Sequence, residues 1–125
     1  MAYIELHRNK LRHNYEFLDS LFKQYHIKWG IVTKLLCGNE LYIKEVIGLG
    51  IKQILDSRVS NLKRAKEIKP GIETVYIKPP AKRSISEIVK YADISFNTEF
   101  ETLKLLSEEA ERQNKIHQVI VMIEL

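Results

Sequence analysis

The chain has 125 residues, of which 45% are hydrophobic and 29% charged, a balance typical of a folded globular protein and not of a disordered one. Its net charge of +4 is spread along the sequence, so no nucleic-acid partner is predicted, while small anionic molecules suit the charge. No apolar run approaches the roughly 18 residues needed to cross a bilayer, and the charged N-terminal segment lacks a signal core. We therefore expect a cytoplasmic protein without a membrane partner.

Apolar residues recur along the chain at helical and strand spacing in regular alternation. After a short extended segment at 3–6, a helix is predicted from about Leu11 to Tyr25. The pattern then predicts five strands, at 29–33, 51–55, 73–77, 93–96 and 119–123. Between them it places helices at 39–48, 59–68, 84–91 and 98–113. A Ser-x-x-Glu capping pattern at Ser84 predicts where the fourth of these five helices begins.

Short strands alternating with helices specify a parallel α/β sheet, which leaves two architectures. A doubly wound sheet could be complete in this length, whereas a (β/α)8 barrel takes about 250 residues. No glycine-rich phosphate loop follows any strand, and the sequence stops inside its most apolar run, 119–125. We therefore predict a partial (β/α)8 TIM-type barrel of about five parallel strands that ends in its fifth strand, with residues 1–125 forming the N-terminal portion of the barrel domain.

One lysine, Lys34, directly follows the first buried strand, before a turn and a helix. In α/β barrels, residues at the carboxyl ends of strands form the rim of the active site. Lys34 is therefore a candidate for forming an imine with an aldehyde cofactor. The alternative is a lysine at a strand end whose charged group simply reaches solvent.

Other polar residues stand at comparable places. Asp56 and Arg58 follow the second strand, where they could form an ion pair that stiffens the rim or could shape a cofactor pocket. Asn97 ends the fourth strand and could bind a cofactor ring or cap the next helix.

The remaining chemistry-bearing residues are given structural roles. Asn61, near a helix start, is interpreted as structural, and Cys37 as a packing residue because no base lies beside it. His13, His26 and His117 are interpreted as surface or interface residues and not as ligands, and no Cys/His spacing predicts a metal site.

Three segments together resemble the alanine/ornithine racemase family, pyridoxal-phosphate (PLP) enzymes of fold type III. They are VTKLLCG at 32–38, LDSRVSNL at 55–62 and YADISFNTE at 91–99, and the similarity runs from 4–6 and 11–14 to 122–125. The lysine and Asp-Ser-Arg segments point to the ornithine-racemase-like branch. Classical alanine racemases carry a phosphate-contacting tyrosine four residues after the lysine, where this chain has Gly38.

The resemblance implies that Lys34 holds PLP as an imine and acts as one of two bases that move the α-proton of alanine or ornithine. Arg58, Asp56 and Asn97 are the further candidates for contacts with PLP. The family places the second base and the phosphate contacts in later parts of the barrel, and it implies a homodimer at full length.

Two alternatives stay open. The first is a PLP-binding protein of the related single-domain barrel family, which serves cofactor homeostasis and does not racemise amino acids. That family has a Gly-Glu-Asn type segment where this chain has Asp56-Ser57-Arg58, so the racemase is favoured. The second is an inactive truncated fragment.

Overall fold

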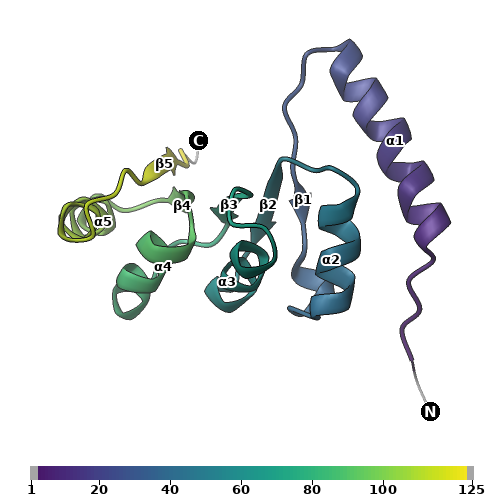
Figure 1. Cartoon of the computed structure of the whole chain (residues 1–125). Helices are drawn as coiled ribbons and strands as arrows, with labels where there is room; N and C mark the ends of the chain where they lie inside the picture. The colour runs from purple at the N-terminus through teal and green to yellow at the C-terminus, as the bar shows by residue number, and fades with distance from the viewer. Residues whose placement is uncertain (1–2, 124–125) are drawn as a thin grey trace.

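The computed structural model describes residues 3–123, which form a parallel five-stranded sheet with helices between successive strands (Figure 1). The strands are β1 (Ile31–Val32), β2 (Gln53–Asp56), β3 (Glu73–Tyr76), β4 (Ile94–Asn97) and β5 (Gln118–Val121). The helices are α1 (Arg8–Gln24), α2 (Glu40–Gly48), α3 (Val59–Ile68), α4 (Ile85–Tyr91) and α5 (Phe100–Arg112), with short 3-10 turns η1 (Lys34–Leu36) and η2 (Lys82–Ser84).

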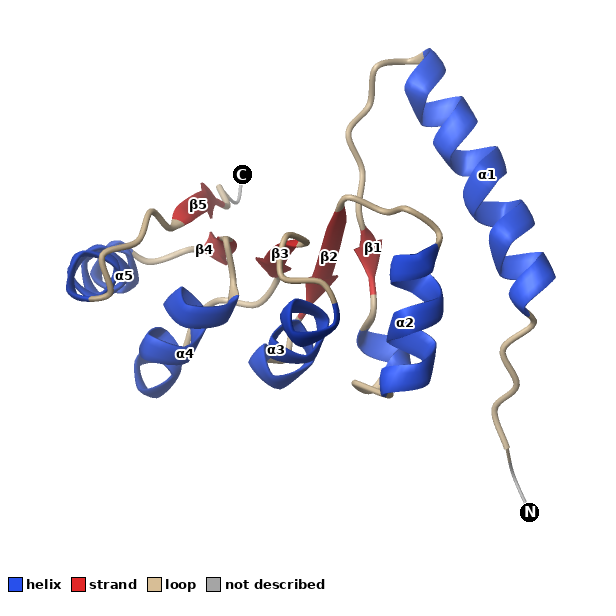
Figure 2. Cartoon of the chain, in the orientation of Figure 1, coloured by secondary structure: helices blue, strands red, loops and turns tan. Residues whose placement is uncertain are grey.

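The strands follow one another in the sheet in chain order, β1-β2-β3-β4-β5, and every neighbouring pair is parallel. A doubly wound sheet reverses its strand order at one point, and this sheet does not. Helices α2 to α5 lie along one side of the row of strands, and α1 stands beyond β1 (Figure 2). The predicted partial barrel of five parallel strands is therefore confirmed, and Glu124 and Leu125, the end of the predicted apolar run, lie outside the described residues.

The core lies between the sheet and helices α2 to α5. Isoleucine, leucine and valine side chains of the helices pack there against Ile54 and Tyr76 of the sheet. The most completely buried are Ile43, Leu62, Ile88 and Leu106 of the helices, together with Ile72, which directly precedes β3. Each full burial of such a side chain contributes about 1.5–3 kcal/mol, which explains why these short helices are stable in context. Among the described residues, no helix is long and apolar enough to cross a membrane.

Local signals explain most element boundaries. Asn39 accepts a hydrogen bond from the Tyr42 N–H at the start of α2, and α3 ends at Ile68, before Pro70 and Gly71. Ser84 ends η2 and is the N-cap residue of α4, so the predicted start of this helix is confirmed, although the Ser84 side chain makes no capping hydrogen bond. The extended segment predicted at 3–6 forms no strand, although the Ile4 carbonyl accepts a hydrogen bond from the Tyr42 hydroxyl.

Candidate functional site

Lys34 lies at the carboxyl edge of the sheet, two residues past the end of β1. It opens the turn η1 instead of ending the strand itself, because the predicted strand at 29–33 is reduced to Ile31–Val32. The Lys34 side chain is exposed, and among the described residues no carboxylate lies within ion-pair distance of it. A lysine amine that is accessible and not held by an acid can react with an aldehyde.

Asp56, at the end of β2, is fully buried and accepts three hydrogen bonds. Its Oδ2 accepts from the Thr33 hydroxyl at 2.9 Å and from the Asn61 side-chain amide at 3.1 Å. Its Oδ1 accepts from the Arg58 backbone N–H at 2.9 Å. Asp56 therefore joins the residue before Lys34 to the first turn of α3, and the structural interpretation of Asn61 agrees with its burial and this bond.

The predicted ion pair between Asp56 and Arg58 is wrong, because Arg58 reaches the carboxylate only through its backbone N–H. The Arg58 guanidinium is exposed, and it makes no ion pair within residues 3–123. The same holds for Lys78, two residues past the end of β3. Each of the first three strands is thus followed two residues later by an exposed cation.

Asn97 ends β4 with a fully buried side chain. Its amide nitrogen donates to the Ser95 carbonyl at 2.8 Å and to the Ser95 hydroxyl at 3.1 Å. Helix α5 begins at Phe100 without a side-chain cap, so Asn97 is not the helix cap that the sequence left open. The Asn97 Oδ1 atom is buried and has no partner in the described part of the chain. The predicted cofactor contacts of Asn97, Asp56 and Arg58 stay predictions.

His117 was interpreted as a surface or interface residue, but it is half-buried between α4 and β4. Its Nδ1 lies 3.1 Å from the Ala92 carbonyl, which can only accept, so Nδ1 carries the proton and Nε2 accepts from the Ser95 hydroxyl at 2.8 Å. Burial lowers the pKa of His117 below its ordinary value of 6.5. The fully buried Ser95 is structural, since a nucleophile has to reach its substrate.

Cys37 is exposed, which contradicts the packing role predicted for it. It adopts a left-handed conformation at φ 49°, and Gly38 follows at φ 74°. The thiol lies 3.7 Å from the Lys34 carbonyl oxygen. The polypeptide therefore reverses direction within four residues of Lys34, and this reversal starts α2.

The face of the sheet opposite the helices is apolar. Because side chains alternate along a strand and Ile54 and Asp56 face the helices, Leu55 faces the other way. The strand register places Val32, Val75 and Ile94 in the same row as Leu55. Phe96 and Ile120 continue this face on β4 and β5. Val32 and Ile120 on the two edge strands are 50% and 41% exposed, whereas Val75 at the centre is 1% exposed, so within the described residues this face is uncovered only toward the sheet edges.

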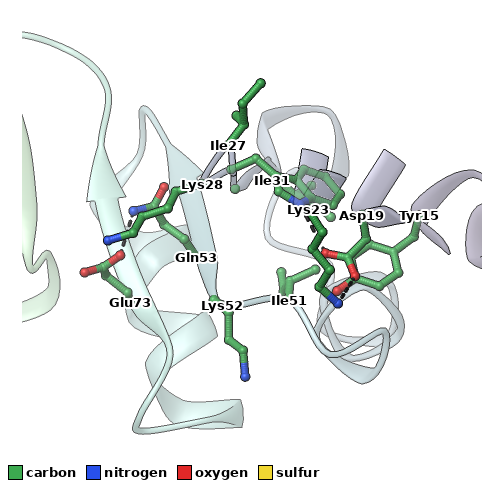
Figure 3. A pocket seen from close by; sticks show the side chains of 12 residues that line it. Tyr15, Asp19, Lys23, Ile27, Lys28, Ile31, Ile51, Lys52, Gln53 and Glu73 are labelled. Atoms are coloured by element: carbon green, nitrogen blue, oxygen red, sulfur yellow. Dashed lines mark hydrogen bonds and ion pairs between the residues drawn. The ribbon is translucent and has the colours of Figure 1, made fainter. Parts of the chain in front are cut away.

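A cavity of about 360 Å³ lies at the opposite end of the strands (Figure 3). Tyr15 and Trp29 form part of its wall, and Gln53 and Glu73, the first residues of β2 and β3, lie at its rim. Lys34 does not line this cavity. Because the chemistry of parallel α/β barrels sits at the carboxyl ends of the strands, we take the edge that carries Lys34 as the candidate site.

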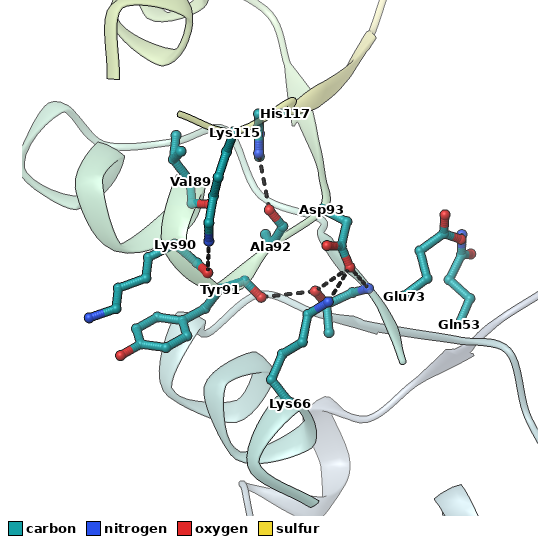
Figure 4. A network of polar contacts seen from close by, with 11 residues as sticks. Gln53, Lys66, Glu73, Val89, Lys90, Tyr91, Ala92, Asp93, Lys115 and His117 are labelled. Carbon is teal, nitrogen blue, oxygen red and sulfur yellow. Dashed lines mark hydrogen bonds and ion pairs between the residues drawn. The ribbon is translucent and has the colours of Figure 1, made fainter. Parts of the chain in front are cut away.

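The amino ends of the strands also hold a polar cluster, centred on Asp93 (Figure 4). One Asp93 oxygen accepts from the Lys66 ammonium at 2.6 Å, from the Thr74 N–H at 2.7 Å and from the Thr74 hydroxyl at 3.0 Å. This cluster links α3, β3 and β4 and leaves Lys66 paired. A charge pair of this kind at the amino ends of the strands stabilises the fold, whereas the active sites of such barrels lie at the carboxyl ends.

Fold and site together define a class: part of a parallel TIM-type barrel that carries an exposed lysine at the carboxyl edge of its first strand. An exposed amine without an acidic partner fits a cofactor that is held through an aldehyde, such as PLP.

Comparison with known proteins finds a curated protein that is similar to this chain in sequence. The chain is 38% identical over 117 residues to the ornithine racemase of Acetoanaerobium sticklandii, a match that covers 94% of the chain and 33% of that protein. The chain thus spans about a third of the length of this curated relative. No family model matches the chain.

A solved structure supports the fold. PipY of Synechococcus elongatus, determined without PLP, superposes with a TM-score of 0.73 and 16% sequence identity, covering 89% of this chain and 54% of that one. At this identity the match shows the fold alone. The resemblance to the racemase family that the three sequence segments predicted is confirmed by the sequence match to ornithine racemase.

Proposed function

We propose that this chain is the lysine-bearing part of a PLP-dependent amino-acid racemase of the ornithine type, with Lys34 as the residue that binds the cofactor. The observation that carries the proposal is the 38% identity to ornithine racemase over 94% of the chain, with Lys34 at the carboxyl edge of a parallel barrel sheet. The PLP-binding carrier remains the alternative that the experiment below separates.

PLP, when bound, supplies an aldehyde that takes up an amine and an electron-withdrawing ring that acidifies the α-carbon of an amino acid. Lys34 supplies the amine that holds the cofactor. Once a substrate amine has taken its place, the free Nζ of Lys34 can remove or return a proton at the substrate α-carbon on one face. Racemisation also needs a proton donor on the opposite face, a role that the proposal assigns to no described residue.

The neighbouring residues suit an anionic ligand. Arg58 and Lys78 stand at the same edge as Lys34 without acidic partners among residues 3–123, and both cofactor phosphate and amino-acid carboxylate are anions. The apolar face that includes Val32 and Leu55 offers apolar surface near the lysine, which a bound ligand would shield from water. We propose that full-length assemblies of this protein act as homodimers on ornithine or alanine.

Absorbance spectra with added PLP and racemisation assays test the proposal. The wild-type chain is expected to develop a long-wavelength absorbance band that borohydride removes, and Lys34→Ala is expected to lack it. Circular dichroism then follows L-ornithine and L-alanine over time in the presence of the full-length protein. Loss of optical activity that depends on Lys34 supports the racemase. A band that depends on Lys34, without racemisation of any amino acid tested by the full-length protein, contradicts the racemase and favours the carrier.

A further inference from the structure

We propose that Thr33, Asp56 and Asn61 are positioning residues that fix the turn carrying Lys34 onto β2 and α3. The inference rests on the proposed function, because it concerns the presentation of the Lys34 amine to PLP. None of the three side chains is predicted to touch the cofactor in this role. They act through the backbone on either side of Lys34.

The first step of the argument is the burial of the Asp56 carboxylate. Thr33, Asp56 and Asn61 are 1%, 0% and 5% exposed. No cation pairs with Asp56 in the described part of the chain, so hydrogen bonds alone satisfy its oxygens. A buried carboxylate is costly unless its oxygens accept well-placed donors, and removing one donor leaves the full desolvation cost. Only an arrangement that keeps all three donors on the Asp56 carboxylate therefore has a low energy.

The second step is that this cluster contacts the turn at both ends. Thr33 directly precedes Lys34, and the Thr33 carbonyl accepts from the Leu36 N–H at 2.9 Å. At the other end, a β-carbon added to Gly38 would lie 2.6 Å from the Asn61 Oδ1. That contact is shorter than real β-carbons make, so Gly38 packs closely against Asn61. The cluster thus holds the turn through the Thr33 hydroxyl at one end and packs against Gly38 at the other, with Lys34 between them.

The third step separates positioning from general stabilisation. Thr74 provides the comparison, because it is also fully buried and its hydroxyl lies within hydrogen-bond distance of two acceptors, the Tyr91 carbonyl at 2.8 Å and the Asp93 carboxylate at 3.0 Å. The Thr74 cluster lies at the amino ends of the strands, away from Lys34. If both threonines only stabilise the fold, Thr33→Val and Thr74→Val will have the same effect on Lys34.

Hydrogen exchange in the 125-residue chain is the first readout, because it needs no cofactor. The amides of Leu36, Cys37 and Asn39 donate within the turn at 2.9, 3.2 and 2.9 Å. We expect Thr33→Val to speed their exchange about tenfold or more over Thr74→Val, since it leaves the buried carboxylate short of a donor. Thr33→Ser, which keeps the hydroxyl, is expected to stay close to wild type.

The second readout is the rate at which PLP and borohydride label Lys34, relative to Lys82, an exposed lysine of η2. Thr33→Val is expected to slow labelling of Lys34 about tenfold and to leave Lys82 unchanged. The exchanged pair Asp56→Asn with Asn61→Asp restores a donor opposite an acceptor, so it is expected to recover labelling that Asp56→Asn alone loses. Recovery of labelling in the double variant would show that Asp56→Asn acts through this hydrogen bond and not through unfolding of the chain.

The proposal is overturned if Thr33→Val and Thr74→Val change turn exchange and Lys34 labelling equally, or if the exchanged pair is no better than Asp56→Asn. If wild-type Lys34 takes no label, the proposed function is contradicted, whatever the role of the three positioning residues. Hydrogen exchange then still decides whether the cluster holds the turn, because that readout does not involve PLP.

Discussion

The two ends of the parallel sheet use charge differently. At the amino ends, Lys66 is paired with Asp93, and Gln53 donates to Glu73 at 2.6 Å. At the carboxyl ends, Lys34 and Arg58 are exposed and have no acidic partner within residues 3–123, while the carboxylate at the end of β2, Asp56, is buried and accepts from uncharged donors. At the amino ends, charged side chains pair with one another and hold the strands together. At the carboxyl ends, the exposed cations Lys34 and Arg58 are available to a ligand.

The largest effect on stability is expected at the amino end. Asp93→Ala removes the acceptor for the Thr74 N–H and for Lys66, while the Thr74 hydroxyl keeps the Tyr91 carbonyl at 2.8 Å, and we expect a cost of about 2–3 kcal/mol of unfolding free energy. Urea denaturation measures this loss. Labelling of Lys34 by PLP in the folded variant is expected to stay unchanged. A fall in that labelling would contradict the inference that the two ends of the sheet have separate roles.

Gly38→Ala is expected to have the next largest effect. The alanine would adopt φ 74° and would place its β-carbon 2.6 Å from Asn61 Oδ1, so we expect a cost of about 1–2 kcal/mol. Unlike Asp93→Ala, this variant is expected to reduce Lys34 labelling. Gly71→Ala is the control, because a β-carbon there meets no atom within 4 Å. Equal behaviour of the two glycine variants would contradict the account of the turn.

His117 predicts a pH dependence of stability. Burial lowers its pKa in the folded chain, and the Lys115 charge acts in the same direction, while Asp93 and the Ala92 carbonyl oppose them. Between the lowered value and 6.5 the unfolded chain binds more protons, so this contribution is complete above about pH 6.5 and is lost as the pH falls.

Denaturation at a series of pH values checks this dependence. His117→Gln cannot take up the proton, so we expect it to flatten the acid side of the profile and to cost about 1 kcal/mol at pH 8, where His117 is neutral. A wild-type profile that already stays level from pH 7 down to pH 5 would contradict the burial of a neutral imidazole.

The smallest effect on folding is expected on β5. Val119, Ile120 and Val121 are 44%, 41% and 53% exposed, and an exposed apolar edge strand invites pairing with a second copy. Ile120→Lys is expected to change the unfolding free energy of the 125-residue chain by no more than about 0.5 kcal/mol and to reduce its self-association. If the wild-type chain sediments as a monomer, β5 does not pair with a second copy and the prediction of self-association is wrong.

Patterns local to the sequence predicted most of the fold. Helix α3 was predicted at its exact bounds, because an apolar stripe and a Pro-Gly stop both act within ten residues. The order of strands and helices and the absence of a phosphate loop led to the barrel, which the sequential strand order confirms. The position of Lys34 near a strand end was also visible from the apolar run before it.

Two of the errors share a physical cause, since they depend on contacts between residues far apart in the chain. His117 is held by Ala92, 25 residues away, and the Asp56 carboxylate binds the side chain of Thr33, 23 residues away, but only the backbone N–H of Arg58. Cys37 is exposed because the turn reverses in a left-handed conformation, which apolar periodicity does not reveal. Polar residues near the ends of two adjacent strands, Thr33 and Asp56, were the one available signal of the buried cluster.

The most direct test of the central claim maps the lysine that PLP occupies. The 125-residue chain is incubated with substoichiometric PLP and reduced with borohydride, and its peptides are analysed by mass spectrometry, with Lys34→Ala and Lys82→Ala as the matched pair. The account predicts that the pyridoxyl group resides on Lys34 in wild type and in Lys82→Ala, and that Lys34→Ala takes up almost none. Label spread over the exposed lysines, and unchanged in Lys34→Ala, would contradict it.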